Sequence, residues 1–511
     1  MSPRGDWREG LPPDVDRGDL PPVEAIRHDS REVAPGDAFV CIEGLRFDGH
    51  EYAAAAVEAG ASVLVAATGR GEALRAAHPT VNVIEVPSPR GSLAALAAAH
   101  EGYPARSLTV VGITGTDGKS TTSFMTHAAL EGAGVRTGLL TTIGTRIGFL
   151  EAAPNATRLT TQEAPTVQRM LAEMVEAGCT HAVVEATSHG LDLHRLDGCE
   201  FDIAVLTNLT PDHLDYHGTF EAYRAAKARL FSMLDEPTTK RTRRVAVINR
   251  DDPSWQHFAR ATRKPLLTYA IEDTDADMVA ADVLGWSDGS TFALRTDEWE
   301  IDASVPLPGA FNVLNATAAI AVAAALRLDP VAAAAGVASM RGVPGRMERV
   351  RGAPFPVIVD YAHTAEALRQ VLEELRPLVE GRLIVVFGCA GERSKERRSG
   401  LGAVAAELAD LAILTEEDPR SEPSEAIIEE IAAAMRAAGA TEGAPAGSGP
   451  RFERVPDRRD AIARALDLAA PGDLVLLAGK GHESTIERAE GPIPWNEHAT
   501  AATLIEARFG P

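Results

Sequence analysis

Residues 107–134, which read SLTVVGITGTDGKSTTSFMTHAALEGAG, decide the fold. An apolar run leads into a glycine-rich turn and then into a segment with helical spacing. This order is typical of a phosphate-binding loop, because the N–H groups and the dipole at a helix N-terminus attract anions. The usual loop has four residues between its first glycine and the Gly-Lys-Ser/Thr, yet five separate Gly112 from Gly118. The stretch therefore predicts a nucleotide site with a different loop, or alternatively a turn whose Ser and Thr cap a helix.

The residues of this loop have separate expected roles. The backbone N–H groups of residues 115–119 are expected to hold phosphate oxygens. The Lys119 ammonium would reach the terminal phosphates, and the Ser120 hydroxyl would bind magnesium.

Short runs rich in Val, Ile and Leu recur along the chain and are separated by helix-sized segments. Examples are ASVLVAA, HAVVEAT, VAVIN, RLIVVFGCA and DLVLLAGKG. This alternation predicts an α/β fold built on mostly parallel sheets. A chain of 511 residues exceeds what one core supports, and composition changes near residues 105 and 343 suggest boundaries. We therefore predict three domains, at 1–105, 106–342 and 343–511.

Composition excludes several classes of function. The net charge of -23 would repel polyphosphate, so we expect no nucleic-acid partner, and the basic run at 240–244 is interpreted as a solvated loop. The four cysteines form no CxxC pair, which favours a reducing compartment. There is no apolar signal region and no run of about 18 apolar residues. We expect a cytoplasmic monomer that does not insert into a membrane.

A second group of chemically suited residues follows two further apolar runs. Glu185 comes just after one run, and His213 lies beside Asp212, Asp215 and His217 after the next. Each of these residues alone is more often part of a solvated loop than a ligand. Parallel strands at 183–186 and 203–207 would bring both segments to the phosphate loop, so Glu185 and His213 become candidate magnesium ligands.

The chain resembles the Mur ligases, the ATP-dependent amino-acid-adding enzymes of peptidoglycan synthesis, and within them the tripeptide synthetases. The match runs in family order from Asp29 to Glu483. It also accounts for the loop, since the family's loop is Gly-Thr-x-Gly-Lys-Ser/Thr-Thr without the distant first glycine. The motifs that carry the resemblance are GTDGKSTT, EATSHGL, TNLTPDHLDYHG, YRAAKARLF, LPGAFNVLNATAA, GVPGRMERV, VIVDYAHT, FGCAGER, EEDPR and GKGHE.

The resemblance implies a UDP-sugar-binding N-terminal domain, a central ATPase domain and a Rossmann-like C-terminal domain. It implies that Lys227 is carbamylated by carbon dioxide and that two Mg²⁺ ions are held by Ser120, Glu185, His213 and the modified Lys227. Without the resemblance, Lys227 would be interpreted as a lysine on a helix surface. The implied ATP-binding residues are Gly115, Thr116, Asp117, Gly118, Lys119, Ser120, Thr121, Asn312, Arg346, Asp360 and His363.

The resemblance also implies where the sugar nucleotide binds. The residues matched to UDP-MurNAc-dipeptide contacts are Ser30, Leu45, Arg46, Phe47, Thr160, Thr161, Thr187 and Arg195. Arg195 suits an anionic substrate. Three positions depart from the family pattern: Thr187 replaces Ser and keeps the hydroxyl, while Leu159 and Leu193 replace Asn and Gln and lose polar contacts.

The added amino acid would be recognised by residues of the C-terminal domain. They are Arg393, Glu417, Asp418, Pro419, Arg420, Gly479 and Glu483. Diaminopimelate-using relatives usually carry Asp-Asn-Pro-Arg where this chain has Glu-Asp-Pro-Arg. Arg420 suits the distal carboxylate of meso-diaminopimelate. Asp418 favours a distal ammonium, as in L-lysine or L-ornithine, and would partly neutralise Arg420. Diaminopimelate is slightly favoured.

The implied reaction joins a diamino acid to the D-Glu γ-carboxylate of UDP-MurNAc-L-Ala-D-Glu through an acyl phosphate, at the expense of ATP. Lys119, Glu185, His213 and Lys227 would be the catalytic residues. One alternative is a ligase like folylpolyglutamate synthetase, which shares the loop and the carbamylated lysine. Another is a regulatory protein that binds ATP without ligating. The segments DSREVAPGD, TSHGL and GKGHE oppose the first, and the intact set of four catalytic residues opposes the second.

Overall fold

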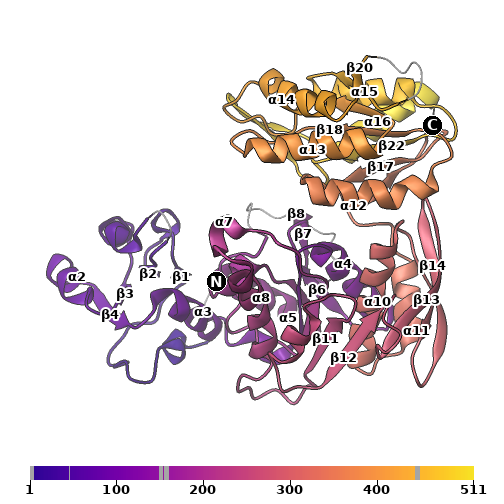
Figure 1. The fold of residues 1–511 in the computed structure, drawn as a ribbon. Helices are drawn as coiled ribbons and strands as arrows, with labels where there is room; N and C mark the ends of the chain where they lie inside the picture. The colour runs from indigo at the N-terminus through magenta and orange to yellow at the C-terminus, as the bar shows by residue number, and fades with distance from the viewer. Residues whose placement is uncertain (1–4, 45–46, 149–152, 155–159, 444–448, 511) are drawn as a thin grey trace. The chain divides into compact units, whose positions relative to one another are not determined.

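A computed structural model describes residues 5–44, 47–148, 153–154, 160–443 and 449–510. Three residues of the sequence analysis lie outside these ranges. They are Leu45 and Arg46, which were expected to contact the sugar nucleotide, and Leu159, which was expected to lose a contact. Figure 1 shows the ribbon with its helices and strands labelled. The chain divides into two compact units. The first comprises Met1–Ala280, Leu294–Glu300 and Asn315–Val337, and the second comprises Ala281–Ala293, Ile301–Leu314 and Ala338–Pro511. Within the described ranges, no helix is long and apolar enough to cross a membrane.

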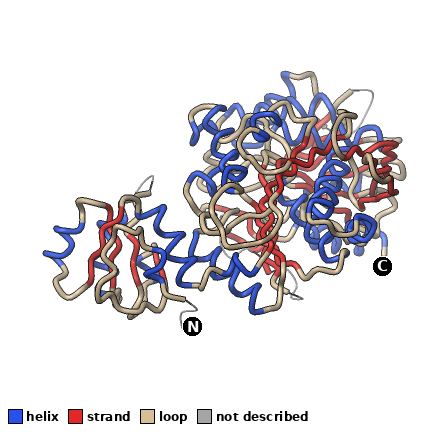
Figure 2. Tube along the Cα trace, turned by 90° about the horizontal axis from the view of Figure 1, so that it is seen from below, coloured by secondary structure: helices blue, strands red, loops and turns tan. Residues whose placement is uncertain are grey.

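The first unit begins with a small sheet of four parallel strands, in the order β1-β2-β3-β4. Helices lie on both sides of this sheet (Figure 2). The strands are β1 (Ile26–Arg27), β2 (Ala38–Val40), β3 (Val63–Ala67) and β4 (Asn82–Val86), and the helices are α1 (Ala53–Glu58), α2 (Gly71–Ala77) and α3 (Pro89–His100).

The segment that precedes β1 is part of this core. Trp7 is 2% exposed, and its indole N–H donates to the Pro21 carbonyl oxygen at 3.0 Å. Leu11 is also buried in the same apolar cluster, which includes residues of the sheet and of α3. Although residues 5–22 are mostly polar and rich in proline, a few apolar side chains in this segment pack into the core of the domain.

The central sheet has the strand order β15-β14-β13-β12-β11-β10-β5-β9-β6-β7-β8. The strands from β13 to β6 in this order pair in parallel, and β7 and β8 add an antiparallel edge. The strands are β5 (Thr109–Thr114), β6 (Thr137–Leu140), β7 (Gly144–Arg146), β8 (Ala153–Pro154), β9 (His181–Glu185), β10 (Ile203–Leu206), β11 (Val245–Asn249), β12 (Leu266–Ala270), β13 (Met278–Trp286), β14 (Gly289–Arg295) and β15 (Glu300–Val305).

Helices connect these strands, as the sequence predicted. They are α4 (Lys119–Gly132), α5 (Ala164–Glu176), α6 (Ser188–Asp192), α7 (Leu214–His217), α8 (Phe220–Met233), α9 (Trp255–Ala259), α10 (Ala310–Ala325) and α11 (Pro330–Ala338). Strand β5 lies between β9 and β10, and the chain crosses from β9 on one side to β10 on the other. The ends of these three strands therefore form a topological switch point. Ligands of open α/β sheets collect at such points.

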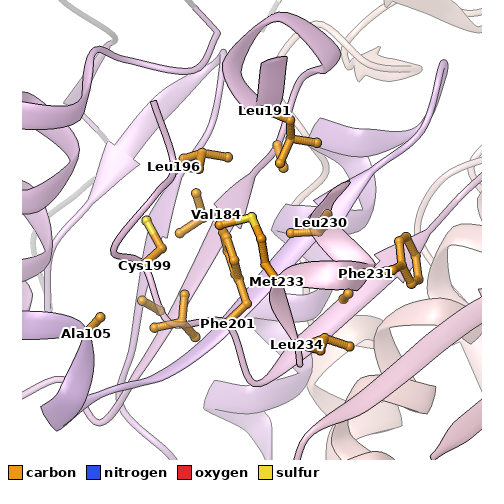
Figure 3. Packing of buried hydrophobic residues seen from close by; sticks show 14 of the residues in the cluster. Ala105, Val184, Leu191, Leu196, Cys199, Phe201, Leu230, Phe231, Met233 and Leu234 are labelled. Carbon is orange, nitrogen blue, oxygen red and sulfur yellow. The ribbon is translucent and has the colours of Figure 1, made fainter. Parts of the chain in front are cut away.

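Apolar side chains from the strands and from α6 and α8 form the core beneath this switch point (Figure 3). Val184 of β9, Leu191 of α6 and Leu230 of α8 are each no more than 2% exposed. Each Å² of apolar surface that these side chains remove from water stabilises the fold by about 25 cal/mol. The cluster therefore stabilises the strand ends that carry the site.

The basic run at 240–244 is a loop before β11, as predicted, and residues 241–243 are exposed. The cationic side chains at its two ends are bonded within the fold. Lys240 is buried and bonded to Asp202. Arg244 donates to the Leu234 and Glu236 carbonyl oxygens at 2.7 and 2.6 Å. Lys240 and Arg244 thus bond to acceptors of neighbouring segments.

The second unit contains a seven-stranded sheet in the order β16-β17-β22-β18-β19-β21-β20. All neighbours pair in parallel except β16 and β17, so the carboxyl ends of β17, β22, β18 and β19 share one edge. The strands are β16 (Glu348–Val350), β17 (Val357–Asp360), β18 (Leu383–Phe387), β19 (Leu411–Leu414), β20 (Thr441–Glu442), β21 (Arg451–Arg454), β22 (Leu474–Ala478) and the separate hairpin β23 (Thr485–Arg488) with β24 (Gly491–Pro494). The helices are α12 (Ala365–Leu375), α13 (Lys395–Leu408), α14 (Ser424–Ala437), α15 (Arg458–Leu468) and α16 (Glu497–Phe509).

Candidate active site

The phosphate loop leaves the carboxyl end of β5 and enters α4. Gly115 and Gly118 have φ angles of +156° and +78°, which favour glycine. The N–H of Thr116 donates to the Asn208 carbonyl oxygen at 2.9 Å, and the N–H of Asp117 donates to the Asn208 side-chain oxygen at 2.9 Å. The segment after β10 therefore fixes the shape of the loop.

Lys119, Ser120 and Thr121 form the first turn of α4. The Lys119 amino group donates to the Thr116 carbonyl oxygen at 2.7 Å, so this side chain folds back over the loop. Ser120 and Thr121 are buried. Together these residues place one cation and two hydroxyls at the positive end of a helix, where phosphate groups bind favourably.

Glu185 ends β9 and contacts the phosphate loop directly. Its Oε2 accepts hydrogen bonds from Ser120 Oγ at 2.9 Å and from the Thr142 N–H at 3.0 Å. Its Oε1 accepts one from Thr142 Oγ1 at 3.1 Å. The carboxylate is 2% exposed, so three hydrogen bonds hold it beside the serine hydroxyl.

Lys227 extends from α8 under the same loop. Its side chain is buried, and Nζ donates to the Gly115 carbonyl oxygen at 2.6 Å. Nζ also lies 4.6 Å from the centre of the Tyr223 ring. Burial, reinforced by the nearby Lys119 charge, lowers the pKa of Lys227 well below its usual value. This shift favours the neutral amine, which is the form that reacts with carbon dioxide.

His213 precedes α7 with a left-handed φ of +52°. Its side chain is half exposed, with Nε2 3.4 Å from an Asp212 carboxylate oxygen. The ring centres of His189 and Tyr223 lie 4.8 and 6.4 Å away. Partial burial, together with the neighbouring His213 and His217, lowers the pKa of His189 to about 4. The group is thus a cluster of aromatic rings, of which the sequence had singled out only His213 and His217.

The side chains around the loop fit the implied Mg²⁺ in their chemistry. Ser120 and Glu185 offer oxygen atoms 2.9 Å apart, and oxygen is the donor that hard cations prefer. A neutral Lys227 amine would become an anionic oxygen donor when carbamylated. The site of the carbamate and the metal donors are therefore consistent with the resemblance.

Thr161 and Thr187, two of the residues predicted to bind the dipeptide, form a hydroxyl pair beside Glu185, which we call the threonine pair. Thr161 Oγ1 lies 2.9 Å from Thr187 Oγ1 and 3.2 Å from the Glu185 carbonyl oxygen. Arg195 donates to the Thr161 carbonyl oxygen at 3.1 Å and pairs with Glu163 at 2.8 Å. A small cavity adjoins these groups and is lined by Thr160, Thr161 and Glu185, among others. These threonines are thus connected to the phosphate loop through Glu185, which also bonds to Ser120.

The two described residues assigned to the uridine side lie in the N-terminal sheet domain. Ser30 begins a 3-10 turn, Ser30–Glu32, that Asp29 caps by accepting the Arg31 N–H at 3.0 Å. Phe47 is 68% exposed and packs edge-on against Tyr52, with ring centres 6.5 Å apart. An aromatic side chain so exposed is available to a ligand.

In the second unit, residues of the predicted nucleotide set gather around Tyr361. The Arg346 guanidinium lies 4.5 Å from the centre of the Tyr361 ring. Asp360 accepts the N–H groups of Met347 and Ala362, both at 2.8 Å. His363 Nδ1 donates to the Tyr361 carbonyl oxygen at 2.7 Å, which leaves Nε2 as the acceptor of the ring.

Asn312 lies in the first turn of α10 and belongs to this unit. Its side-chain amide donates to the Pro308 carbonyl oxygen at 2.7 Å and is buried. The contact fixes the side chain at the helix start.

The predicted amino-acid residues cluster at the carboxyl ends of β18, β19 and β22. Asp418 Oδ1 accepts hydrogen bonds from Lys480 Nζ at 2.8 Å and from the Glu487 N–H at 2.9 Å. Lys480 is fully buried and also donates to Glu483 at 2.5 Å. Asp418 thus bonds to a lysine 62 residues away, while Arg420 lies near Glu392.

Glu417 lies behind this group and is almost fully buried. Its Oε2 has no hydrogen-bond partner among the described residues, and a Cβ on Gly479, whose φ is +107°, would come within 3.2 Å of it. Burial raises the pKa of Glu417 to about 7, against the opposing effect of Lys480.

The two predicted arginines of this site are more accessible. Arg393 is exposed. Arg420 has a left-handed φ of +55° after Pro419, and its guanidinium is 3.7 Å from Glu392. A weak ion pair of this kind leaves a guanidinium able to bind a carboxylate.

Sequence reasoning missed three residues that organise the two sites: Asn208, Tyr361 and Lys480. Each lies inside a motif that had been quoted for its neighbours. Lys480 could have been predicted from the sequence, because it lies two residues after a continuous apolar strand. A lysine buried at such a strand end needs an acidic partner.

A different acidic group in the N-terminal domain is not a metal site. Among the described residues, Glu43, Asp48 and His50 form the one cluster of at least three acidic or His/Cys side chains close enough to share an ion. His50 Nδ1 is 2.6 Å from Asp48, and Nε2 accepts the Ala67 N–H at 3.0 Å. Both ring nitrogens are engaged, so the histidine has no lone pair for a metal.

Comparison with known proteins identifies the family. The Mur ligase family catalytic domain matches residues 22–101, the Mur ligase middle domain matches 113–323, and the Mur ligase glutamate ligase domain matches 345–481. The UDP-N-acetylmuramyl-tripeptide synthetase of Roseiflexus sp. (strain RS-1) is 45% identical over 504 residues, covering 96% of each chain. The chain belongs to the Mur ligase family.

Two further similarities agree with this membership. The UDP-N-acetylmuramoyl-L-alanyl-D-glutamate–2,6-diaminopimelate ligase of Bacillus licheniformis is 41% identical and covers 91% of each chain. A solved structure of a ligase with the same name has a TM-score of 0.69 and 32% identity, covering 98% of this chain and 99% of its own. As a Mur ligase, the protein is an ATP-dependent amide ligase that uses Mg²⁺, and its α/β fold with mostly parallel sheets is that of the family.

Proposed function

We propose that this Mur ligase adds a diamino acid to the D-Glu γ-carboxylate of UDP-MurNAc-L-Ala-D-Glu. The γ-carboxylate attacks the γ-phosphate of ATP, which gives an acyl phosphate and ADP. The amine of the diamino acid then attacks the acyl carbon, and inorganic phosphate leaves. The names of the relatives, which describe tripeptide synthetases and diaminopimelate ligases, support this choice of substrate.

The observation that carries the proposal is the contact between the two halves of the first site. Thr161, matched to the dipeptide, bonds to the carbonyl oxygen of Glu185, whose carboxylate bonds to Ser120 of the phosphate loop. A carboxylate held by Thr161, Thr187 and Arg195 would thus lie next to bound ATP. This is the proximity that phosphoryl transfer to a carboxylate requires.

We assign the residues of the first site as follows. Lys119 and the N–H groups of residues 115–121 bind the phosphates, and the positive charge of Lys119 stabilises the charge of the transferring group. Ser120, Glu185, His213 and a carbamylated Lys227 would hold two Mg²⁺ ions. Bound Mg²⁺ would neutralise phosphate charge.

The remaining assignments follow the family motifs. Ser30, Phe47 and residues 45–46 would bind the UDP moiety, while Asn312, Arg346, Asp360 and His363 would bind ATP. The three-domain division at 105 and 343 is part of the proposal, and the separate family matches support it.

For the added amino acid we propose meso-diaminopimelate. Arg420 and Arg393 supply accessible guanidinium groups, and Asp418 is already engaged by Lys480. A guanidinium suits the distal carboxylate of diaminopimelate, which lysine and ornithine lack. Glu417, Gly479, Pro419 and Glu483 would complete the pocket.

Phosphate release with UDP-MurNAc-L-Ala-D-Glu, ATP and Mg²⁺ tests the proposal, with meso-diaminopimelate, L-lysine and L-ornithine compared at equal concentration. We expect release with diaminopimelate to exceed release with the other two. Release with lysine or ornithine alone would refute the choice of amino acid. Absence of release with all three would refute the reaction, and a parallel assay with a folate and glutamate would test the folylpolyglutamate alternative.

A further inference from the structure

The His189 ring lies at the centre of the aromatic group around the first site. Its centre is 4.8 Å from that of His213, with the two planes at 87°, and 4.2 Å from that of Tyr216. The His217 ring is 5.4 Å away. His189 thus contacts every ring of the segment that runs from His213 through α7, while none of the roles assigned above uses it.

The helix that carries His189 is firmly anchored. Leu191 of α6 is fully buried in the core below (Figure 3). Arg229 of α8 donates a hydrogen bond to the Leu191 carbonyl oxygen, and Asp192 accepts one from the Tyr216 hydroxyl at 2.8 Å. The helix is therefore a fixed support, and the α7 segment is attached to it by one hydrogen bond and by the rings.

The start of the same helix reaches the dipeptide pocket. Thr187 caps α6 by accepting the Gly190 N–H at 3.0 Å, and its own N–H donates to Thr161 Oγ1 at 3.2 Å. One short helix therefore joins the threonine pair to the rings around His213.

His213 itself has few other constraints on its orientation. It follows a loop, its φ is left-handed, its side chain is half exposed and its ion pair is with the adjacent Asp212. Such a side chain needs packing to keep one rotamer. The edge-on His189 ring supplies that packing on one side, and the more distant Tyr223 ring lies on another.

We infer that His189 is a positioning residue whose ring fixes the His213 imidazole at the metal–phosphate site and links its position to the threonine pair of the dipeptide pocket. The inference rests on the proposed function in that His213 is taken to serve bound metal–nucleotide. Groups that orient a metal ligand commonly change metal affinity by 10–100-fold when they are removed.

Binding of Mn²⁺ in the presence of the non-hydrolysable analogue AMP-PNP, followed by electron paramagnetic resonance on the full chain, tests the inference without ligation. We expect His189→Ala to weaken Mn²⁺ binding about tenfold. His189→Phe keeps a ring and should stay within about twofold of the wild type. His257→Ala is the matched control, because it removes an imidazole that packs on Phe258 (ring centres 5.7 Å apart) away from the site.

The dipeptide side provides a second measurement. His189→Ala should raise the KM for UDP-MurNAc-L-Ala-D-Glu as well, whereas His189→Phe should restore it. A merely structural role would change the unfolding temperature without this rescue pattern.

Two results would overturn the inference. One is a folded His189→Ala protein that binds Mn²⁺ as tightly as the wild type does. The other is a folded His189→Phe protein that has lost Mn²⁺ affinity. If His189→Ala does not fold, the His189→Phe measurement decides alone. Wild-type protein that binds Mn²⁺ with AMP-PNP but releases no phosphate with any diamino acid would refute the proposed function and leave this inference standing.

Discussion

The amino group of Lys227 donates a hydrogen bond to the carbonyl oxygen of Gly115 across 2.6 Å, from a position that is 2% exposed. The Lys227 side chain thus joins α8 to Gly115, the first residue of the phosphate loop. A buried lysine without a carboxylate partner is costly unless it loses its charge or is modified. The contact therefore places this amine at the phosphate loop, where burial favours its neutral form.

Replacing Lys227 by Ala should reduce phosphate release at least a hundredfold, and added bicarbonate should restore little, because the nitrogen that would carry the carbamate is gone. Incubation with ¹³C-labelled bicarbonate should give a carbamate signal by NMR in the wild type and none in the variant. Lys264→Ala, on a part-exposed lysine, is the control. Full activity of a folded Lys227→Ala protein would rule out the carbamate.

Glu417 should make stability depend on pH. Its pKa rises from 4.5 to about 7 on folding, so the folded state keeps a proton that the unfolded chain releases. Stability is then full below pH 4.5, declines as pH rises toward 7, and is lower by about 3 kcal/mol above that. Glu417→Gln removes the carboxylate and therefore this loss of stability at high pH.

The stability gain of Glu417→Gln over the wild type should therefore be larger at pH 8 than at pH 5, measured as the difference in urea unfolding midpoints. Glu58→Gln, at the exposed end of α1, is the matched control for loss of a carboxylate. A gain of the same size at both pH values would contradict the assignment of the titration to Glu417.

Gly345 should tolerate no side chain. Its φ is +65°, and a Cβ there would lie 2.1 Å from the His482 backbone nitrogen. Gly345→Ala must displace the segment that carries Arg346 and should cost several kcal/mol. Gly342→Ala also has positive φ, +117°, but meets nothing within 4 Å, and should cost about 1–2 kcal/mol. Thermal unfolding compares the pair, and equal costs would contradict the close approach.

Trp7 should contribute strongly to the stability of the N-terminal domain. Trp7→Ala removes a buried indole and should cost about 3–5 kcal/mol. Trp286, which is 45% exposed, provides the comparison, and Trp286→Ala should change stability by about 0.5 kcal/mol or less. Hydrogen exchange of residues 5–22 measures the local effect, and undiminished protection in Trp7→Ala would show that the indole does not anchor the segment.

The sequence predicted the elements around the phosphate loop closely, because their signals are local. The runs expected as strands at 183–186 and 203–207 are β9 and β10, at His181–Glu185 and Ile203–Leu206. Buried parallel strands appear as continuous apolar runs, and the glycine loop marks its own helix. Gly112 lies inside β5, so the apparent extra residue of the loop belongs to a strand.

The features that the sequence could not provide depend on distant partners. Lys480 and Asp418 are 62 residues apart, and no local pattern joins them. The cations at 240–244 find carbonyl and carboxylate acceptors that only the folded chain presents. The N-terminal segment is held by single apolar residues among polar ones, which gives no periodic signal. The rings around His189 come from α6 and α7, whose adjacency depends on the tertiary fold.

Lys480, shared between Asp418 and Glu483, has a consequence for how amino-acid preference can evolve in this chain. Because one buried cation satisfies both acids, a change at any of the three positions alters the energetic effect of a change at the others. Substitutions here are epistatic. An exchange at Asp418 would therefore have one effect while Glu483 is present and another once Glu483 has changed.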